Sequence, residues 1–195
     1  HLAVELVRGL GSDNIDHRLR HAEFPPFSGV RWLGTSIASL SKLQRVLVVG
    51  SNLRKDHPLF AQRIRQATRQ GCVVTAINAL QHDWAMPVAH TLLQPASGWA
   101  AALAEVAAAI AEAKGLPLPA GVNASFDATA QAIAQSLLSG ERKAVLLGNA
   151  AAHHAQASRL LALAYWIGTQ TGASIGYLTE AANTVGAQFV HAQPM

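Results

Sequence analysis

Two short runs of consecutive apolar residues stand out along the chain, residues 46–49 and 144–147, and a glycine ends each of them. Unbroken apolar runs of this length are typical of strands buried on both faces of a parallel sheet. Each run is followed by a helical pattern that ends at a glycine and then by another apolar run, at residues 72–77 and 173–177. We therefore predict two Rossmann-like βαβ units in one doubly wound, mainly parallel α/β sheet flanked by helices.

Helical spacing and loop residues organise the rest of the chain. Trp99, Leu103, Val106 and Ile110 recur every three or four residues, which predicts an amphipathic helix. The Pro/Gly-rich stretch 114–123 cannot continue that helix, so a loop is expected before a helix that starts near Ser125 or Asp127. Phe24-Pro25-Pro26-Phe27-Ser28-Gly29 breaks any helix near the beginning. We expect residues 1–27 to be a segment left from a preceding domain and residues 28–195 to form the α/β domain.

The predicted strands at residues 46–49 and 144–147 suggest where a ligand would bind. Ligands of doubly wound sheets lie beyond the carboxyl ends of the strands, which here places a site at residues 50–55 and 148–154. The backbone N–H groups of Gly50, Ser51 and Asn52 are candidates for contact with a phosphate or ribose. Against this, G-x-G-x-x-G is absent, and Asn78 stands where an acidic ribose ligand would be expected. We favour the interpretation that Gly50 serves a tight turn after the strand, without any ligand.

Composition excludes several classes of protein. Half of the residues are hydrophobic and only 13% are charged, which is incompatible with intrinsic disorder. The single cysteine, Cys72, cannot form an internal disulfide or hold an iron-sulfur cluster. No apolar stretch is long enough for direct membrane insertion.

The positive net charge of +4 is unevenly placed. Residues 1–71 hold 11 of the 15 basic side chains and 5 of the 11 acidic ones. Arg63, Arg65 and Arg69 lie on a predicted helix without interleaved aromatic residues. We therefore interpret them as a solvated face, or as one docked on a neighbouring acidic surface, and expect no nucleic-acid partner.

Candidate chemistry elsewhere is weak, so we predict no catalytic residue and no metal ligand. Adjacent helical residues such as His153 and His154 point about 100° apart, and no carboxylate or cysteine stands at ligand spacing. Asp16-His17 and Asp56-His57 lack a nearby nucleophile, and capping or loop hydrogen bonding explains their aspartates. The tryptophans at positions 32, 84, 99 and 166 are expected to be core or interface anchors. We expect Trp84, Trp99 and Trp166 to lie partly on a partner-facing surface.

Three segments together carry a resemblance to a known family. They are Asp13-Asn14-Ile15-Asp16-His17-Arg18-Leu19-Arg20, Val48-Val49-Gly50-Ser51-Asn52-Leu53-Arg54-Lys55-Asp56-His57-Pro58 and Leu178-Thr179-Glu180-Ala181-Ala182-Asn183-Thr184-Val185-Gly186. In this order and spacing the chain resembles the molybdopterin-oxidoreductase-like region of the large peripheral subunit of bacterial NADH:quinone oxidoreductase (complex I). Gly-Ser-Asn with the following His-Pro is shared with formate dehydrogenases and nitrate reductases, whereas the other two segments narrow the resemblance to the complex I subunit.

The resemblance implies a structural scaffold within the electron-input arm of complex I. Its partners would be other peripheral-arm subunits on the cytoplasmic side of the bacterial inner membrane, and the chain would be a piece of a longer protein. The parent would bind its iron-sulfur clusters outside this chain, and the chain itself would hold no cofactor. Gly50, Ser51 and Asn52 would be a vestige of the loop that holds a molybdopterin guanine dinucleotide in the active enzymes. When isolated, the chain is expected to self-associate.

Two other functions compete with the scaffold. The first is a functional cofactor-binding piece of a molybdopterin oxidoreductase of the formate dehydrogenase or nitrate reductase type. The loop at Gly50 favours this function, whereas the lack of an acid at Asn78 and of a cysteine or selenocysteine ligand for molybdenum argues against it. The second is an independent nucleotide-dependent dehydrogenase, which the missing dinucleotide fingerprint disfavours.

Overall fold

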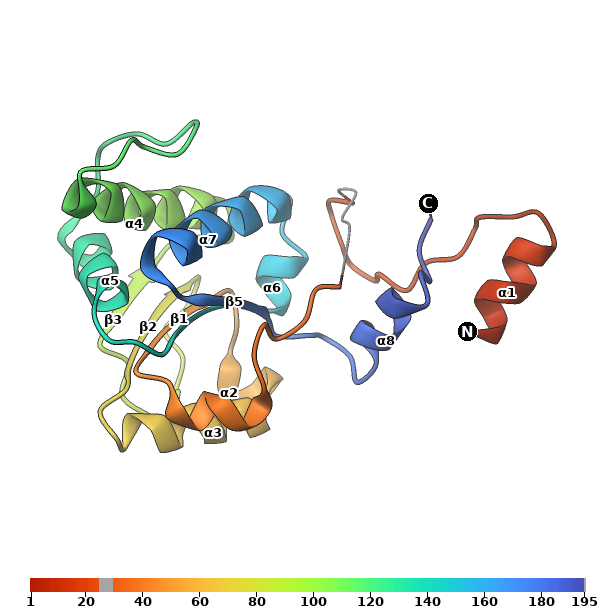
Figure 1. Cartoon of the computed structure of the whole chain (residues 1–195), viewed down its shortest axis with the longest axis horizontal. Coiled ribbons are helices and arrows are strands. Elements are labelled where there is room, and N and C mark those ends of the chain that lie inside the picture. The colour runs from red at the N-terminus through yellow and green to blue at the C-terminus, as the bar shows by residue number, and fades with distance from the viewer. Residues whose placement is uncertain (25–29, 195) are drawn as a thin grey trace.

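A five-stranded parallel sheet forms the centre of the molecule, as the computed structural model shows for the residues it describes, 1–24 and 30–194 (Figure 1). The strands are β1 (Arg45–Val49), β2 (Val73–Asn78), β3 (His90–Leu93), β4 (Lys143–Leu147) and β5 (Ser174–Tyr177). Their order across the sheet is β3-β2-β1-β4-β5, and every neighbouring pair is parallel. The predicted doubly wound α/β fold is therefore confirmed.

Helices cover both faces of this sheet. One layer contains α4 (Trp99–Lys114), α5 (Ala128–Leu138) and α7 (Ala157–Thr171), and the other contains α2 (Leu53–Asp56), α3 (Pro58–Thr68) and the 3-10 helix η1 (Ile37–Lys42). The short helix α6 (Asn149–Ala152) follows β4 at the carboxyl edge of the sheet. The 3-10 turn η2 (Ala96–Gly98) precedes α4, and α1 (Leu2–Gly9) and α8 (Thr184–Phe189) lie near the two ends of the chain.

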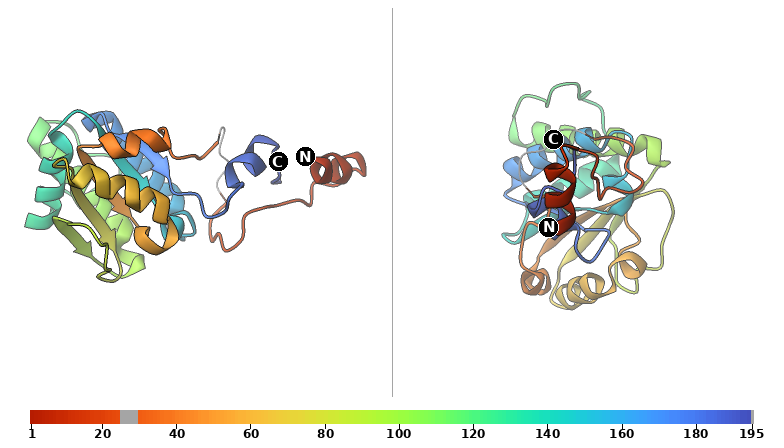
Figure 2. Two further views of the ribbon diagram at one scale, coloured as in Figure 1. Left: turned by 90° about the horizontal axis from the view of Figure 1, so that it is seen from below. Right: turned by 90° about the vertical axis from the view of Figure 1, so that its right-hand side faces the viewer.

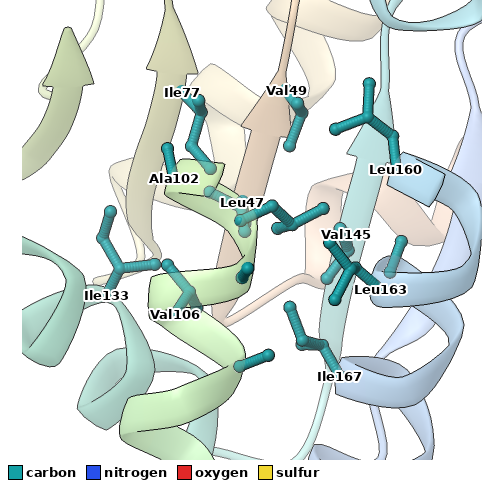
Figure 3. Packing of buried hydrophobic residues seen from close by; sticks show 14 of the residues in the cluster. Leu47, Val49, Ile77, Ala102, Val106, Ile133, Val145, Leu160, Leu163 and Ile167 are labelled. Atoms are coloured by element: carbon teal, nitrogen blue, oxygen red, sulfur yellow. The ribbon is translucent and has the colours of Figure 1, made fainter. Parts of the chain in front are cut away.

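Alternate residues of the central strand β1 point into two separate cores. Leu47 and Val49 pack beneath α4, α5 and α7, where Figure 3 shows them among the buried side chains of these helices. Val46 and Val48 pack on the opposite face beneath η1, α2 and α3. This two-sided burial is the physical reason for the unbroken apolar run in the sequence.

The tryptophans only partly follow the sequence prediction. Trp84 is 6% exposed and packs in the core under α3, and Trp99 is 4% exposed and packs in the core under α4. The expectation that both contribute to a partner-facing surface is wrong, because the domain buries them itself. Trp166 is partly buried against the core under α4, and Trp32 is exposed.

Two local features differ from the predicted elements. The sequence did not predict β3, an edge strand in which only Leu92 is buried, so it lacks a continuous apolar run. Asp56 does not cap α3, which has no side-chain cap. Instead, the Asp56 carboxylate, at the end of α2, accepts a hydrogen bond from the Asn52 N–H at 2.9 Å, which is the local hydrogen bonding that the sequence offered as the alternative to capping. By contrast, Asp127 caps α5, as predicted, by accepting from the Ala130 N–H at 2.7 Å.

The two ends of the chain form an extension beside the α/β body (Figure 2). The guanidinium of Arg8 donates to the His191 carbonyl at 2.9 Å, and His17 Nδ1 lies 2.8 Å from the Ala192 carbonyl oxygen. Gln188 of α8 brackets the backbone of Arg31, accepting from its N–H at 2.7 Å and donating to its carbonyl at 3.3 Å. The expected domain boundary at residues 27 and 28 lies outside the described residues.

Among the described residues, none of the helices combines the length and the hydrophobicity that crossing a bilayer would require.

Candidate functional site at the carboxyl edge of the sheet

The loops after β1 and β4 meet where the chain changes direction across the sheet, the place where ligands bind in this architecture. Here the two loops contact each other directly. The Gly148 N–H donates to the Val49 carbonyl at 2.8 Å, and the Ala150 N–H donates to the Gly50 carbonyl at 3.2 Å. His57 Nε2 also lies 3.3 Å from Asn149 Oδ1, which joins the start of α3 to α6.

The backbone N–H groups predicted to face a phosphate are all engaged within the protein. The Gly50 N–H donates to the Ile77 carbonyl at 2.9 Å, and the Ser51 N–H donates to Asn78 Oδ1 at 3.1 Å. The Asn52 N–H is bound to the Asp56 carboxylate, which also accepts from the Ser51 hydroxyl at 3.0 Å. An incoming phosphate would have to displace each of these acceptors.

Asn78 has a structural partner rather than a free amide. Besides accepting from the Ser51 N–H, its Nδ2 donates to the Ser51 carbonyl at 3.2 Å, and the side chain is buried. The pair of bonds fixes the loop after β1 against the end of β2. These donors fit a bound molybdopterin guanine dinucleotide poorly, because the three backbone N–H groups and the Asn78 amide already have partners within the protein. One buried atom of the loop, Asn52 Oδ1, has no hydrogen-bond partner among the residues that the structure describes.

A hollow lies beside this crevice, between the α/β body and the two terminal segments. Its lining includes residues of two of the three segments that carried the family resemblance, residues 13–20 and 178–186. The lining residues near the body are Ala152, Tyr177 and Leu178, and those from the terminal segments include His17, Arg18, His21, Glu23, Thr179, Glu180 and Gln188. An adjoining hollow shares Glu180 and extends to His153 and Asn149. The sequence predicted a site at the edge of the sheet, which stays a prediction, and did not predict this second wall.

Glu180 lies between two histidines from distant parts of the chain. Its Oε2 is hydrogen-bonded to Nε2 of His153, which directly follows α6, and its Oε1 lies 3.5 Å from His21 Nε2. The two imidazole rings meet edge to face, with centroids 5.0 Å apart. Burial lowers the pKa of His21 below its ordinary value, while the Glu180 carboxylate acts in the opposite direction.

The neighbouring His154 is directed elsewhere. Its Nε2 lies 2.7 Å from the Ala96 carbonyl oxygen, and its ring stacks on Trp99. The two histidines do not begin a helix, as the sequence predicted, but lie in the turn between α6 and α7. The expectation that no carboxylate is placed to join a histidine holds only for spacing along the chain. The fold brings Glu180 to His153 from 27 residues away, which no local motif reveals.

Other charged groups of the hollow are held by specific partners. The Arg18 guanidinium forms an ion pair with Asp16 at 2.7 Å, and this hydrogen bond lowers the pKa of the Asp16 carboxyl. Glu23 accepts hydrogen bonds from the hydroxyl and the N–H of Ser158, which lower its pKa and fasten the N-terminal segment to the first turn of α7. Burial raises the pKa of Tyr177 to about 12, so its hydroxyl is neutral at physiological pH.

Cys72, the one cysteine of the sequence, lies far from this hollow. It precedes β2 at the amino end of the strand, within the core under α3, and burial raises the pKa of its thiol to about 11. A thiol in this state is a poor metal ligand and a poor nucleophile.

Comparisons with known proteins agree with this architecture. The family model of the molybdopterin oxidoreductases matches residues 1–194. A probable oxidoreductase of Bacillus subtilis (strain 168), YjgC, is 30% identical over 93 residues, which represent 44% of this chain and 9% of that protein. The match thus spans about a tenth of the length of the curated relative.

Proposed function

Because the chain belongs to the molybdopterin oxidoreductase family, we propose that it is a domain of a larger redox enzyme in which it serves as a scaffold without a cofactor of its own. The finer assignment within the family is the large peripheral subunit of bacterial NADH:quinone oxidoreductase. It rests on the resemblance of the Asn14 to Arg18 and Thr179 to Asn183 segments. Both segments lie at the same hollow, so they act as one structural unit.

The observation that carries the scaffold role is the state of the loop after β1. Its three N–H groups, at Gly50, Ser51 and Asn52, already donate to Ile77, Asn78 and Asp56. Each such hydrogen bond stabilises the fold by about 0.5–1.5 kcal/mol. A phosphate that replaced these acceptors would remove that stabilisation. The same bonds fix the loop after β1 to the end of β2 and to α2, which gives the rigid carboxyl edge that a scaffold requires.

The proposed setting follows from the same assignment. The domain would contact other peripheral-arm subunits on the cytoplasmic face of the bacterial inner membrane, and the iron-sulfur clusters would lie in other parts of the parent protein. Electron transfer from NADH to quinone would pass through those clusters. This chain would hold in position the parts of the complex that carry those clusters.

One observation favours the second candidate, a functional cofactor-binding piece of a molybdopterin oxidoreductase. Asn52 Oδ1 is buried without a partner, directly in the loop that contacts the cofactor in the active enzymes that the chain resembles. A buried acceptor without a donor is costly, and a ligand N–H would satisfy it. This single acceptor is weaker evidence for a bound cofactor than the three engaged N–H groups are against one.

Cofactor analysis separates the two candidates. The chain should be produced in cells supplied with molybdate and tungstate, then assayed for metal by mass spectrometry and for pterin by fluorescence after oxidation. Calorimetric titration with GDP, GTP and NADH follows on the same sample. The scaffold role predicts substoichiometric molybdenum and tungsten and no selective nucleotide binding. Stoichiometric metal, or micromolar affinity for a guanine nucleotide over its adenine counterpart, would establish the second candidate instead.

A separate experiment addresses the complex I assignment. The parent protein, tagged at its chromosomal locus, should co-purify with NADH:quinone reductase activity from solubilised membranes. Co-purification with formate or nitrate reductase activity, and with no NADH oxidation, would refute the assignment while leaving family membership intact.

A further inference from the structure

The cluster formed by His21, His153 and Glu180 has the composition of a transition-metal site. Each side chain offers one ligand atom, and these atoms all lie within 4.8 Å of one another. Zinc sites in proteins place nitrogen and carboxylate ligands about 2.0–2.2 Å from the ion, which puts ligand atoms roughly 3–3.5 Å apart. Glu180 Oε1 and His21 Nε2 are already at 3.5 Å. A shift of about 1 Å in the remaining pairs would complete the arrangement.

The surroundings of the cluster are those of an accessible but sheltered site. The side chains of His21, His153 and Glu180 are 12%, 20% and 22% exposed. His21 and Glu180 line one hollow, and His153 and Glu180 line the adjoining one. An ion held by the three groups would therefore be reachable from solvent, and a coordination position would face the hollow for a water molecule or another donor.

The donor set selects the class of ion. Two imidazole nitrogens and one carboxylate oxygen suit Zn²⁺ and its neighbours in the first transition series. Calcium and magnesium prefer sites built almost entirely of oxygen, so they are poor competitors here. We propose that His21, His153 and Glu180 bind one divalent ion of the zinc type, with a coordination position left open toward the hollow.

The position of the three ligands in the fold gives the ion a structural consequence. His21 belongs to the N-terminal segment, His153 follows α6 on the α/β body, and Glu180 follows β5 on the way to α8. Metal binding would thus tie both terminal segments to the body at one point. Glu23 makes a second attachment of the N-terminal segment through Ser158. The ion would fasten the wall of the hollow, which goes beyond the scaffold role and does not depend on it.

Metal titration of the complete 195-residue chain tests the proposal. After removal of metal with EDTA, the chain is titrated with Zn²⁺ by calorimetry and with Co²⁺ by visible spectroscopy, in buffer containing millimolar Mg²⁺ and Ca²⁺. We expect one equivalent of either ion to bind and the Co²⁺ complex to show the intense d–d absorption of a low-coordinate N/O site. A Zn²⁺ concentration 100-fold above Kd should raise Tm by roughly 5 °C.

Single variants identify the ligands. His21→Gln, His153→Gln and Glu180→Gln should each weaken Zn²⁺ affinity at least about tenfold, as expected for loss of a ligand. His154→Gln is the matched control, because that neighbouring histidine is bound to the Ala96 carbonyl and should leave the affinity unchanged. His1→Gln controls for binding at the N-terminal His1–Glu5 pair.

A substituted ligand keeps the proposal falsifiable where a variant destabilises the chain. His153→Cys should retain one equivalent of Co²⁺ and add a thiolate charge-transfer band, which arises only if residue 153 coordinates the ion. Far-UV circular dichroism of each metal-free variant monitors folding. Absence of saturable Zn²⁺ binding, affinity unaffected by His153→Gln, or a His153→Cys spectrum without the thiolate band would each show a hydrogen-bonded triad only and overturn the proposal.

Discussion

Gly50 is the residue on which the junction of the two βαβ units depends. Its φ is +65°, and an added Cβ would lie 2.7 Å from Trp99 Cζ3 and 2.8 Å from the Ala151 nitrogen. Gly50→Ala should therefore lower the free energy of unfolding by about 3 kcal/mol, combining about 1–2 kcal/mol of left-handed backbone strain with overpacking. Denaturant unfolding followed by circular dichroism measures this loss.

Gly115 provides a matched control for the backbone term alone. Its φ is +61°, and no atom of the described residues lies within 4 Å of an added Cβ. Gly115→Ala should cost only about 1 kcal/mol, so the difference between the two variants isolates the close approach of Trp99 and Ala151. Equal losses for both variants would mean that the crowding around Gly50 relaxes without cost.

At the scale of single residues, the sequence predicted backbone conformation better than it predicted which side chains contact one another. The place of Gly50 at the end of an apolar run was enough to predict a tight turn. The hydrogen-bond partners of Ser51 were not predictable, because only the folded chain brings Asn78 and Asp56 next to it. His21, His153 and Glu180 come from three separate segments, and no spacing rule joins them. Trp84 and Trp99 show the same limit, since their sequence neighbours do not reveal which layer covers them.

At the scale of elements, the contact between the start of α3 and α6 should respond to pH. Burial lowers the pKa of His57 below its ordinary value of 6.5, although its hydrogen bond with Asn149 and the charge of Asp56 oppose the shift. The unfolded chain therefore binds a proton near pH 6.5, before the folded chain does. Stability should fall as pH drops through this range and level off below the folded pKa.

The variant His57→Gln measures this dependence. An amide retains a donor for Asn149 Oδ1 but has no proton to gain. The free energy of unfolding between pH 7.5 and pH 5 should decline less in the variant than in the parent chain, as monitored by urea titration at each pH. Parallel curves for the two proteins would show that His57 titrates alike in the folded and unfolded states.

The elements themselves were predictable to different degrees for physical reasons. β1 and β4 are buried on both faces, so burial imposes an apolar run that is easy to recognise. β3 lies at the edge of the sheet and buries only Leu92, so neither a run nor a clear alternation arises. α8 buries none of its residues and has no apolar face that a periodicity could reveal.

At the scale of the whole molecule, the extension exposes apolar side chains that the α/β body does not cover. Leu2, Leu6 and Leu10 follow each other at intervals of four residues on or next to α1, and all three are exposed. A stripe of this kind promotes association in water. We expect the apparent mass of the isolated chain to rise with concentration in light scattering.

Substitution within the stripe tests its role. Leu6→Glu should shift the association to higher concentration, whereas Leu59→Glu should not, although Leu59 on α3 is exposed to a similar degree. A mass that stays monomeric at all concentrations, or an equal effect of both variants, would exclude α1 as the cause.

The hydrogen bonds that Arg8 and His17 make to residues 191 and 192 also bring the beginning and the end of the chain together (Figure 2). A polypeptide whose ends are neighbours tolerates circular permutation, provided that the new ends open in an exposed loop. Pro117 and Leu118, between α4 and α5, are both exposed. A permutant that joins the old ends by a short glycine-serine linker and begins at Leu118 should fold cooperatively, with the far-UV circular dichroism of the parent. The order in which the two βαβ units are synthesised would then be interchangeable, and only their pairing through β1 and β4 would be essential to the fold.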